Sequence, residues 1–145
     1  MDMRIEKREA FYVSGYSVKA NEATHERDLA LLREKYESKL KSLTPLLYFV
    51  AWIAEDGEYT LLLGVQAQNQ TPIAKGAPCI EVPAGCFAVG VVPEGTPIMT
   101  AWGDFFETGI PALGVAFDVE HGVYFGCFDE TGGCELWTPV IKADI

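Results

Sequence analysis

The stretch from Gly114 to Val140 mixes carboxylates with aromatic rings, and these side chains together could bind a charged ligand. Four of its residues are candidates to face such a site: Asp118, Glu120, Glu135 and Trp137. A carboxylate that is partly buried among aromatic rings keeps its charge poorly, because desolvation favours the neutral acid. A bound cation restores the balance, and each ring face adds a cation–π attraction of roughly 0.5–2 kcal/mol. The pattern therefore predicts a receptor for a cationic ligand.

The composition is that of one soluble, globular domain with an acidic surface. The chain has 145 residues, of which 49% are hydrophobic and 22% are charged, and this suits a single core. Its net charge of -10 repels phosphate backbones, so we expect no nucleic-acid partner. The N-terminus lacks the apolar run of a signal peptide, and no stretch has the roughly 18 apolar residues of a membrane span. We expect a cytoplasmic protein with no membrane partner.

The cysteines and the known catalytic patterns indicate no metal and no cofactor. The four cysteines lack the Cys-x-x-Cys spacing of a zinc or redox site: Cys79, Cys86, Cys127 and Cys134. Free cysteine is commonly buried, so we expect reduced, partly buried thiols. No phosphate-binding loop and no Ser-His-Asp order is present.

The first half of the chain predicts the element order strand, helix, strand, strand. Alternating residues predict a strand over 10–19, and two nearly apolar strands over 47–54 and 59–66 are joined by the hairpin signal Asp56-Gly57. Each of these two strands is expected to be covered on both faces.

The helix of this half is predicted over 24–42. Asn21 and Thr24 offer N-caps, and apolar residues recur at three- and four-residue spacing from Leu29 onward. His25, early in this helix, is expected to be solvated. The opposite face of the helix is also expected to be charged and solvated: Glu26, Arg33, Glu34, Glu37 and Lys41.

After a polar link over 67–78, the second half repeats this order. A strand is predicted over 80–91, and a short helix over 98–106 is expected to be capped by Thr96 with Pro97 at its first position. Three further strand candidates follow: 114–120, 123–128 and 135–141.

The duplication predicts an α+β fold built from two pseudo-symmetric strand-helix-strand-strand repeats. The repeats span about 5–67 and 79–141 of a single domain over 1–145, with antiparallel sheets and two helices. Neither half can cover its sheet alone, so the halves are expected to pack about a pseudo-twofold axis and to leave a central groove. Such grooves are common places for small-ligand sites.

This order and several short motifs resemble the GyrI-like effector-binding domains. These domains occur at the end of AraC-type and MerR-type multidrug-responsive bacterial regulators and as free-standing proteins. The likeness covers nearly the whole chain from Ile5, and it is carried by IEVPAGCFAV from Ile80, by Trp102, by Glu120 before an aromatic strand, and by the closing ELWTPV. No helix-turn-helix sequence precedes the domain, so we expect a free-standing binding domain and not a DNA-binding regulator.

The resemblance implies that bulky, cationic aromatic or lipophilic compounds bind in the groove. It assigns the counter-charge to Glu120, and it matches Glu135 and Trp137 to the carboxylate and aromatic of the last strand. Asp118 shares a strand face with Glu120, so the register leaves open which of the two reaches the ligand. The full set of expected ligand-binding residues is Glu120, Asp118, Trp102, Trp137, Glu135, Phe106, Tyr124 and Trp52.

Two other functions stay open at this point. Some free-standing relatives hydrolyse reactive cyclopropane-bearing compounds with a groove glutamate, so Glu120 could position a water as a catalytic residue. His121 is expected to point to the opposite strand face and adds no support for catalysis. The name-giving member of the family sequesters a topoisomerase, so the acidic surface could instead bind a protein partner. A homodimer also stays open.

Overall fold

The computed structural model spans residues 1–145, and the structure describes residues 1–21, 23–43, 47–55, 58–67, 72, 74–118, 123–129 and 133–142. Within these ranges, the side chains of 37, 40–43, 47–55 and 142 are not described. The strands are β1 (Asp2–Arg8), β2 (Phe11–Ala20), β3 (Leu47–Glu55), β4 (Glu58–Ala67), β5 (Cys79–Val82), β6 (Gly85–Val91), β7 (Val115–Phe117), β8 (Val123–Asp129) and β9 (Cys134–Lys142). The helices are α1 (His25–Leu43), α2 (Ile98–Asp104), the π-helical turn η1 (Phe105–Gly109) and α3 (Ile110–Ala112).

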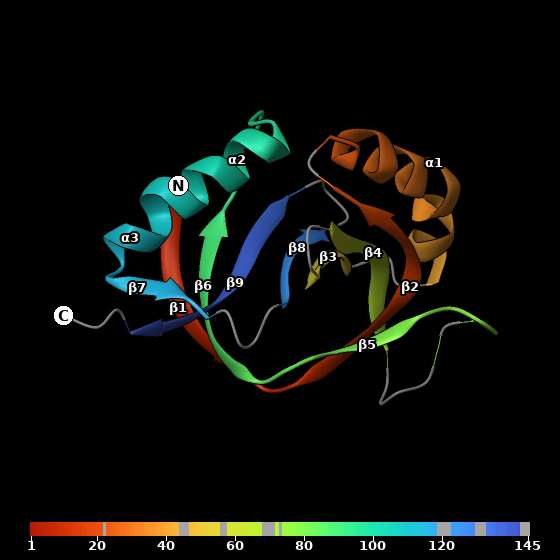
Figure 1. Ribbon diagram of the computed structural model, residues 1–145, viewed down its shortest axis with the longest axis horizontal. Helices are drawn as coiled ribbons and strands as arrows, with labels where there is room; N and C mark the ends of the chain where they lie inside the picture. Colours follow the sequence, from red (N-terminus) through yellow and green to blue (C-terminus); the bar gives the residue numbers. More distant parts are fainter. Residues whose placement is uncertain are drawn as a thin grey trace.

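The strands form a strongly curled antiparallel sheet, with α1 and α2 lying over opposite ends of it (Figure 1). The strand order is β1-β6-β9-β8-β3-β4-β2-β5, and β7 pairs with the C-terminal end of β9. The two halves of this order are equivalent: if β1 is exchanged with β5, β2 with β6, β3 with β8 and β4 with β9, the order becomes its own reverse. This confirms the predicted α+β fold of two pseudo-symmetric repeats.

Two seams join the halves of the sheet. At the centre, β3 pairs with β8, so that Val50 lies opposite Gly126. Along the outer ribbon, the first strand of each half pairs with the other half: β1 with β6, and β5 with β2. Because each repeat donates a strand to the other, neither sheet half is complete alone.

Three local features differ from the prediction. β1 is a strand that the periodicity does not predict, because its sequence DMRIEKR is mostly charged, as suits an edge strand that pairs only with β6. The strand predicted over 80–91 is divided into β5 and β6 at Pro83, which has no N–H for a ladder bond. The short helix continues past residue 106 through η1 into α3.

The expected cap of the short helix is also wrong. Pro97 occupies the N-cap position of α2, and no side chain caps the helix with a hydrogen bond. The backbone N–H of Thr96 instead donates to the carbonyl oxygen of Pro93 at 3.1 Å, in a turn that contains Gly95 with a φ of 82°. This turn lies beside the groove described below.

The two predicted cap residues organise the turn before α1, but their described side-chain hydrogen bonds go to this turn and not to the first N–H groups of the helix. The side-chain oxygen of Asn21 accepts hydrogen bonds from the backbone N–H groups of Ala23 and Thr24, at 2.9 and 3.1 Å. The Thr24 hydroxyl oxygen accepts one from the N–H of Asn21 at 3.1 Å. Glu26 and Asp28 place negative charge in the first turn, where the helix dipole favours it.

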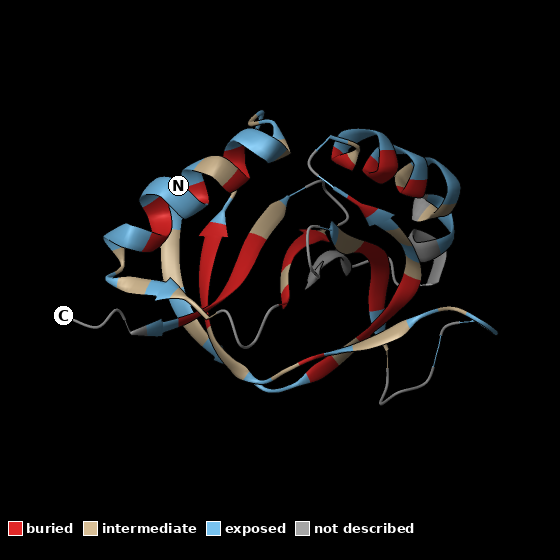
Figure 2. Ribbon diagram, viewed as in Figure 1, coloured by how far each residue is buried: buried red, intermediate tan, exposed pale blue. Residues whose placement is uncertain are grey.

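The middle of β4 is buried on both faces of the sheet. We call the side beneath the helices the helix face and the opposite side the rear face. Leu61, Leu62 and Leu63 are all 0% exposed, although successive residues of a strand point to opposite faces. Figure 2 shows buried residues along the strands and on the inward sides of the helices. The expectation that the strand over 59–66 is covered on both faces is confirmed.

Two glycines allow β2 and β4 to approach closely where the sheet curls. Gly15 lies directly opposite Gly64 in the ladder. A Cβ on Gly15 would collide with the backbone carbonyl of Leu63, so a side chain at this position would push the strands apart.

Candidate functional site

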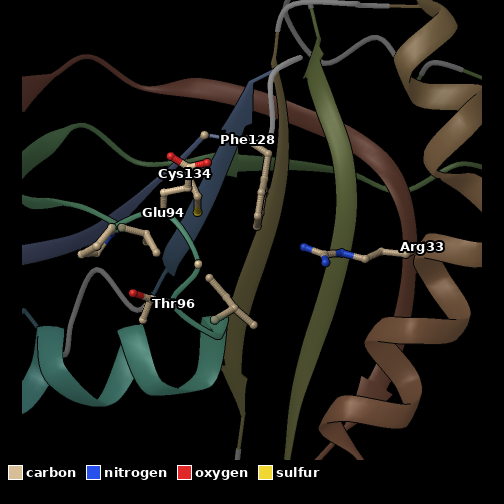
Figure 3. A pocket seen from close by; sticks show the side chains of 10 residues that line it. Arg33, Glu94, Thr96, Phe128 and Cys134 are labelled. Atoms are coloured by element: carbon tan, nitrogen blue, oxygen red, sulfur yellow. The ribbon is translucent and has the colours of Figure 1, made fainter.

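A groove lies between α1 and α2 on the helix face, and Figure 3 shows its larger cavity from close by. This cavity has a volume of about 620 Å³, within the range typical of small-ligand pockets. Its walls come from both halves of the chain: Arg33 of α1, Glu94 and Thr96 of the turn before α2, Ile98 of α2, Phe128 of β8 and Cys134 of β9. A second cavity of about 290 Å³ lies between residues 25–33 of α1 and 97–99 at the start of α2.

Arg33 crosses the groove from α1 toward Phe128 (Figure 3). Its guanidinium carbon lies 4.9 Å from the centre of the Phe128 ring, which is a cation–π distance. Its Nε and Nη2 atoms are buried and have no hydrogen-bond partner among the residues that the structure describes. The expectation that Arg33 lies on the solvated face of the helix is wrong, because this position is one helical turn after Leu29, on the apolar side.

His25 also faces the groove and is only 2% exposed, which corrects the expectation of a solvated histidine. Its ring centre lies 5.8 Å from that of Tyr59. Burial lowers the pKa of His25 below its ordinary value, and the nearby carboxylates of Glu26 and Asp28 partly oppose this shift. The imidazole is therefore predominantly neutral at pH 7.

Three of the expected aromatic residues come together beside the groove. The Trp102 ring stacks on Phe106 at 5.7 Å and 20°, and it meets Tyr124 edge-on at 5.4 Å. Phe117 contacts both Phe106 and Tyr124, at 6.3 and 6.1 Å. We call Trp102, Phe106, Phe117 and Tyr124 the aromatic cluster. Burial raises the pKa of Tyr124 to about 12, so the cluster carries no charge of its own at neutral pH.

Trp102 connects this cluster to the groove. It lines a recess of about 10 Å³ together with His25, Arg33 and Phe128. The recess is too small for a drug-sized ligand, so a bulky ligand that reaches Trp102 has to displace a neighbouring side chain. Arg33, a long side chain that lines the recess and both larger cavities, is the natural candidate.

Trp137 and Glu135 lie on the rear face and line none of these three cavities. Trp137 stacks on Phe125 at 5.7 Å and 11°, and the guanidinium carbon of Arg8 lies 5.3 Å from its ring centre. A carboxylate oxygen of Glu135 lies 2.9 Å from a guanidinium nitrogen of Arg4. The ligand-binding role expected for this pair stays a prediction, on a different face from Trp102.

The remaining candidates are placed only in part. Asp118 is half-buried just after β7, and its backbone N–H donates to the carbonyl oxygen of Pro139 at 2.8 Å. Trp52 lies opposite Tyr124 in the ladder of β3 and β8, but its side chain is outside the described part of the structure. Glu120 and His121 also lie outside the described residues.

Two of the four thiols, those of Cys127 and Cys134, are protonated at neutral pH. Burial raises the pKa of Cys127 to about 11 and that of Cys134 to about 12. Among the described residues, no group of three His, Cys, Asp or Glu side chains could hold a metal ion. The same residues include no helix that is long and apolar enough to cross a membrane.

Comparison with known proteins identifies the fold through structure and not through sequence. No protein-family model and no curated protein matches the chain. The structure of SAV2435 bound to tetraphenylphosphonium matches with a TM-score of 0.76 and 14% identity, over 97% of this chain and 94% of that one. The C-terminal domain of EcmrR matches with a TM-score of 0.64 and 8% identity, over 98% of both chains. The fold is the GyrI-like effector-binding fold.

An integron cassette protein of Vibrio cholerae shares the GyrI-like fold as well, with a TM-score of 0.72 and 13% identity over 96% of this chain and 95% of that one. These matches confirm the fold that the sequence resemblance implies. At such low identities, the likeness extends to the arrangement of the strands and helices and assigns no individual residue.

The two larger cavities are lined by residues outside the sequence-based set, and the spacing could have indicated three of them: His25, Arg33 and Phe128. His25 precedes Leu29 by one helical turn and Arg33 follows it by one, so extending the apolar stripe in both directions places both on the buried side of α1. Phe128 follows Tyr124 and Gly126 at the two-residue period of β8, which puts it on the same face as Tyr124. The spacing carries these signals, but the charge of the first two residues masks them.

Proposed function

We propose that this chain is a small-molecule-binding domain that captures bulky, aromatic, cationic compounds in the groove between α1 and α2. The observation that carries the proposal is the fold shared over 97% of the chain with a protein whose structure holds tetraphenylphosphonium, a lipophilic aromatic cation. The groove lies between the two repeats, where a pseudo-symmetric fold of this kind offers a shared pocket.

The chemistry of the groove supports a large aromatic ligand. A cavity of about 620 Å³ has room for one; Phe128 lines this cavity, and Trp102 lines the small recess that shares Arg33 and Phe128 with it. The chain carries a net charge of -10, which raises the local concentration of cations around the molecule. Entry of a ligand as far as Trp102 requires Arg33 to move away from the recess.

The counter-charge in this proposal comes from the segment around Asp118 and Glu120. Asp118 follows Phe117, whose ring belongs to the aromatic cluster, so a carboxylate there lies close in sequence to the rings that would stack on the ligand. Glu135 is less suitable, because its charge is already paired with Arg4 at 2.9 Å.

The test is a calorimetric titration of the protein with tetraphenylphosphonium. We expect saturable 1:1 binding that also quenches tryptophan fluorescence. Trp102→Leu removes a stacking surface and should weaken binding about 10-fold, since this corresponds to about 1.4 kcal/mol. Trp137→Phe is the matched control: it alters a tryptophan of equal exposure on the rear face, and it should leave the affinity within about twofold.

The carboxylate assignment is tested in the same assay. Glu120→Gln should weaken binding of the cation, whereas Asp118→Asn should do so if the strand register places that residue toward the ligand. If both variants bind as tightly as the wild type, the counter-charge lies elsewhere. Absence of saturable binding to the wild-type protein would overturn the proposed function itself.

A further inference from the structure

The wall of the groove includes a positively charged side chain, Arg33, and some of its hydrogen-bond donors are not used by the described residues. Arg33 lines all three of the cavities described above. A guanidinium has five N–H donors and stays protonated at any physiological pH. The Phe128 ring offers an attractive face at 4.9 Å but no lone pair for an N–H group. Nε and Nη2 are buried without an acceptor among the described residues.

A buried guanidinium with open donors is unfavourable unless an acceptor reaches it. Transfer of a charged group away from water costs several kcal/mol unless the group is paired and hydrogen-bonded. On the rear face, Arg4 meets this requirement through ion pairs with Glu6 and Glu135, at 2.8 and 2.9 Å. Within the described part of the groove, Arg33 has no such ion pair.

The other groups on the cavity wall leave room for an anion. Thr96 is half-buried on this wall, and a threonine hydroxyl can donate a hydrogen bond. Cys134 adds no negative charge at neutral pH, because burial raises its pKa to about 12. The carboxylates of Glu94 and Glu26 lie on exposed residues at the rim, where water screens them.

We propose that the Arg33 end of the groove is a subsite for an anionic group, such as a carboxylate, sulfonate or phosphate, carried by an aromatic ligand. The guanidinium binds such a group through the N–H donors that the protein leaves open, and Phe128 packs beside the ligand's ring. Planar, bidentate recognition of oxyanions is what an arginine does better than a lysine. This inference rests on the proposed function only for the location of the ligand, and it extends the ligand class to anionic and zwitterionic aromatic compounds.

The experiment uses two ions of nearly the same shape and opposite charge, tetraphenylphosphonium and tetraphenylborate, with 1-anilinonaphthalene-8-sulfonate as an anion that has hydrogen-bond acceptors. Each is titrated calorimetrically into the wild-type protein, Arg33→Gln, Arg33→Lys and the control Arg8→Gln. We expect the wild type to bind both anions saturably. Arg33→Gln should weaken the sulfonate at least 10-fold and should strengthen tetraphenylphosphonium, because a like charge has been removed. Arg33→Lys should retain tetraphenylborate and weaken only the sulfonate.

The control separates a built subsite from general attraction of anions to arginine. Arg8 also lies over aromatic rings, at 3.9 Å from the centre of Phe11, but on the rear face. Arg8→Gln should leave anion affinity unchanged, and unchanged anion affinity in Arg33→Gln would overturn the subsite. A wild-type protein that binds the anions and not tetraphenylphosphonium contradicts the proposed function and supports the subsite. Binding of the cation alone contradicts the subsite and supports the proposed function.

Discussion

Trp102 and Trp137 are each 6% exposed, yet they belong to regions with opposite character. Trp102 lies on the helix face, where its ring neighbours Phe105, Phe106 and Tyr124 are uncharged. Trp137 lies on the rear face, where the guanidinium carbons of Arg4 and Arg8 lie 5.8 and 5.3 Å from its ring centre. Exposure alone therefore does not distinguish a binding surface from a structural cluster.

The distinction lies in whether the guanidinium groups of each region keep buried nitrogens without a hydrogen-bond acceptor. The rear face has the rings and the carboxylate that a cation receptor needs. The chain's own arginines occupy them, because Arg4 bonds to Glu135 and Arg8 stacks on Phe11. Its interactions are internal to the fold. In the groove, Arg33 lies over Phe128 with two buried nitrogens that no described residue satisfies. A buried charged group with unsatisfied donors is the feature that points to a ligand, and among the described arginines Arg33 has it whereas Arg4 and Arg8 do not.

The largest expected effect is a loss of stability when the ring of Trp137 is removed from the rear face. Trp137→Ala takes a large side chain out of a core that includes Phe87 and Phe125, and it should lower the free energy of unfolding by about 3–5 kcal/mol. The affinity for tetraphenylphosphonium should stay within about twofold of the wild type, measured under conditions where the variant is folded. Urea unfolding followed by circular dichroism gives the first quantity, and calorimetry gives the second.

A large loss of affinity in Trp137→Ala has two readings that a milder variant separates. Nε1 of Trp137 is buried without a hydrogen-bond partner among the described residues, so Trp137→Phe sacrifices no such bond and should destabilise much less. If Trp137→Phe also loses affinity, the rear face takes part in binding and the contrast between the two regions is wrong.

The sequence predicts the element order well because its periodic signals are strong. The helix predicted over 24–42 is α1, His25–Leu43, and each predicted hairpin strand is present within a residue or two. The duplicated element order also predicts a groove between the two halves. β1 escapes prediction because an edge strand with charged residues needs no apolar period, and its partner β6 lies far away in sequence.

The face of each side chain is harder to predict than the element that carries it. In β9, Leu136 is 0% exposed on the helix face and Trp137 is 6% exposed on the rear face. When both faces are buried, the alternation of polar and apolar residues vanishes, and with it the signal that would assign Trp137 to a side. Trp102 is singled out by the family resemblance and not by periodicity, and its binding role stays a prediction. Glu120 lies outside the described residues, so its place is still a prediction.

A smaller effect is the acid sensitivity that His25 gives to the groove region. His25 is buried in the groove, and burial lowers its pKa from the ordinary value of 6.5. The unfolded chain therefore binds a proton more readily than the folded one, so this contribution to stability is fully present above about pH 6.5 and is lost as the pH falls below it. His25→Phe should remove this part of the acid sensitivity, as measured by urea midpoints between pH 8 and pH 5. His121→Gln is the control, and an equal loss of acid sensitivity in that variant contradicts the assignment to His25.

The smallest expected effect is on the chemical reactivity of two thiols, one in each region. Cys127 belongs to the rear-face core and Cys134 lines the groove, and burial raises their pKa values from 9.0 to about 11 and about 12. At pH 8 their thiolate fractions are then about 100-fold and about 1,000-fold below that of a thiol with a pKa of 9.0, so both should react with iodoacetamide far more slowly than such a thiol.

Ligand protection then discriminates between the two slow thiols. A compound that fills the 620 Å³ cavity covers Cys134 and leaves Cys127 untouched on the other side of the sheet. Saturating 1-anilinonaphthalene-8-sulfonate should therefore slow labelling of Cys134 alone, as followed by peptide mass spectrometry after extended incubation. Equal protection of both thiols would mean that the ligand tightens the whole fold, since a compound in the groove cannot shield the rear face directly. Protection of Cys127 alone would place the ligand among Trp137 and its arginines, and the region that we interpret as structural would then be the binding site.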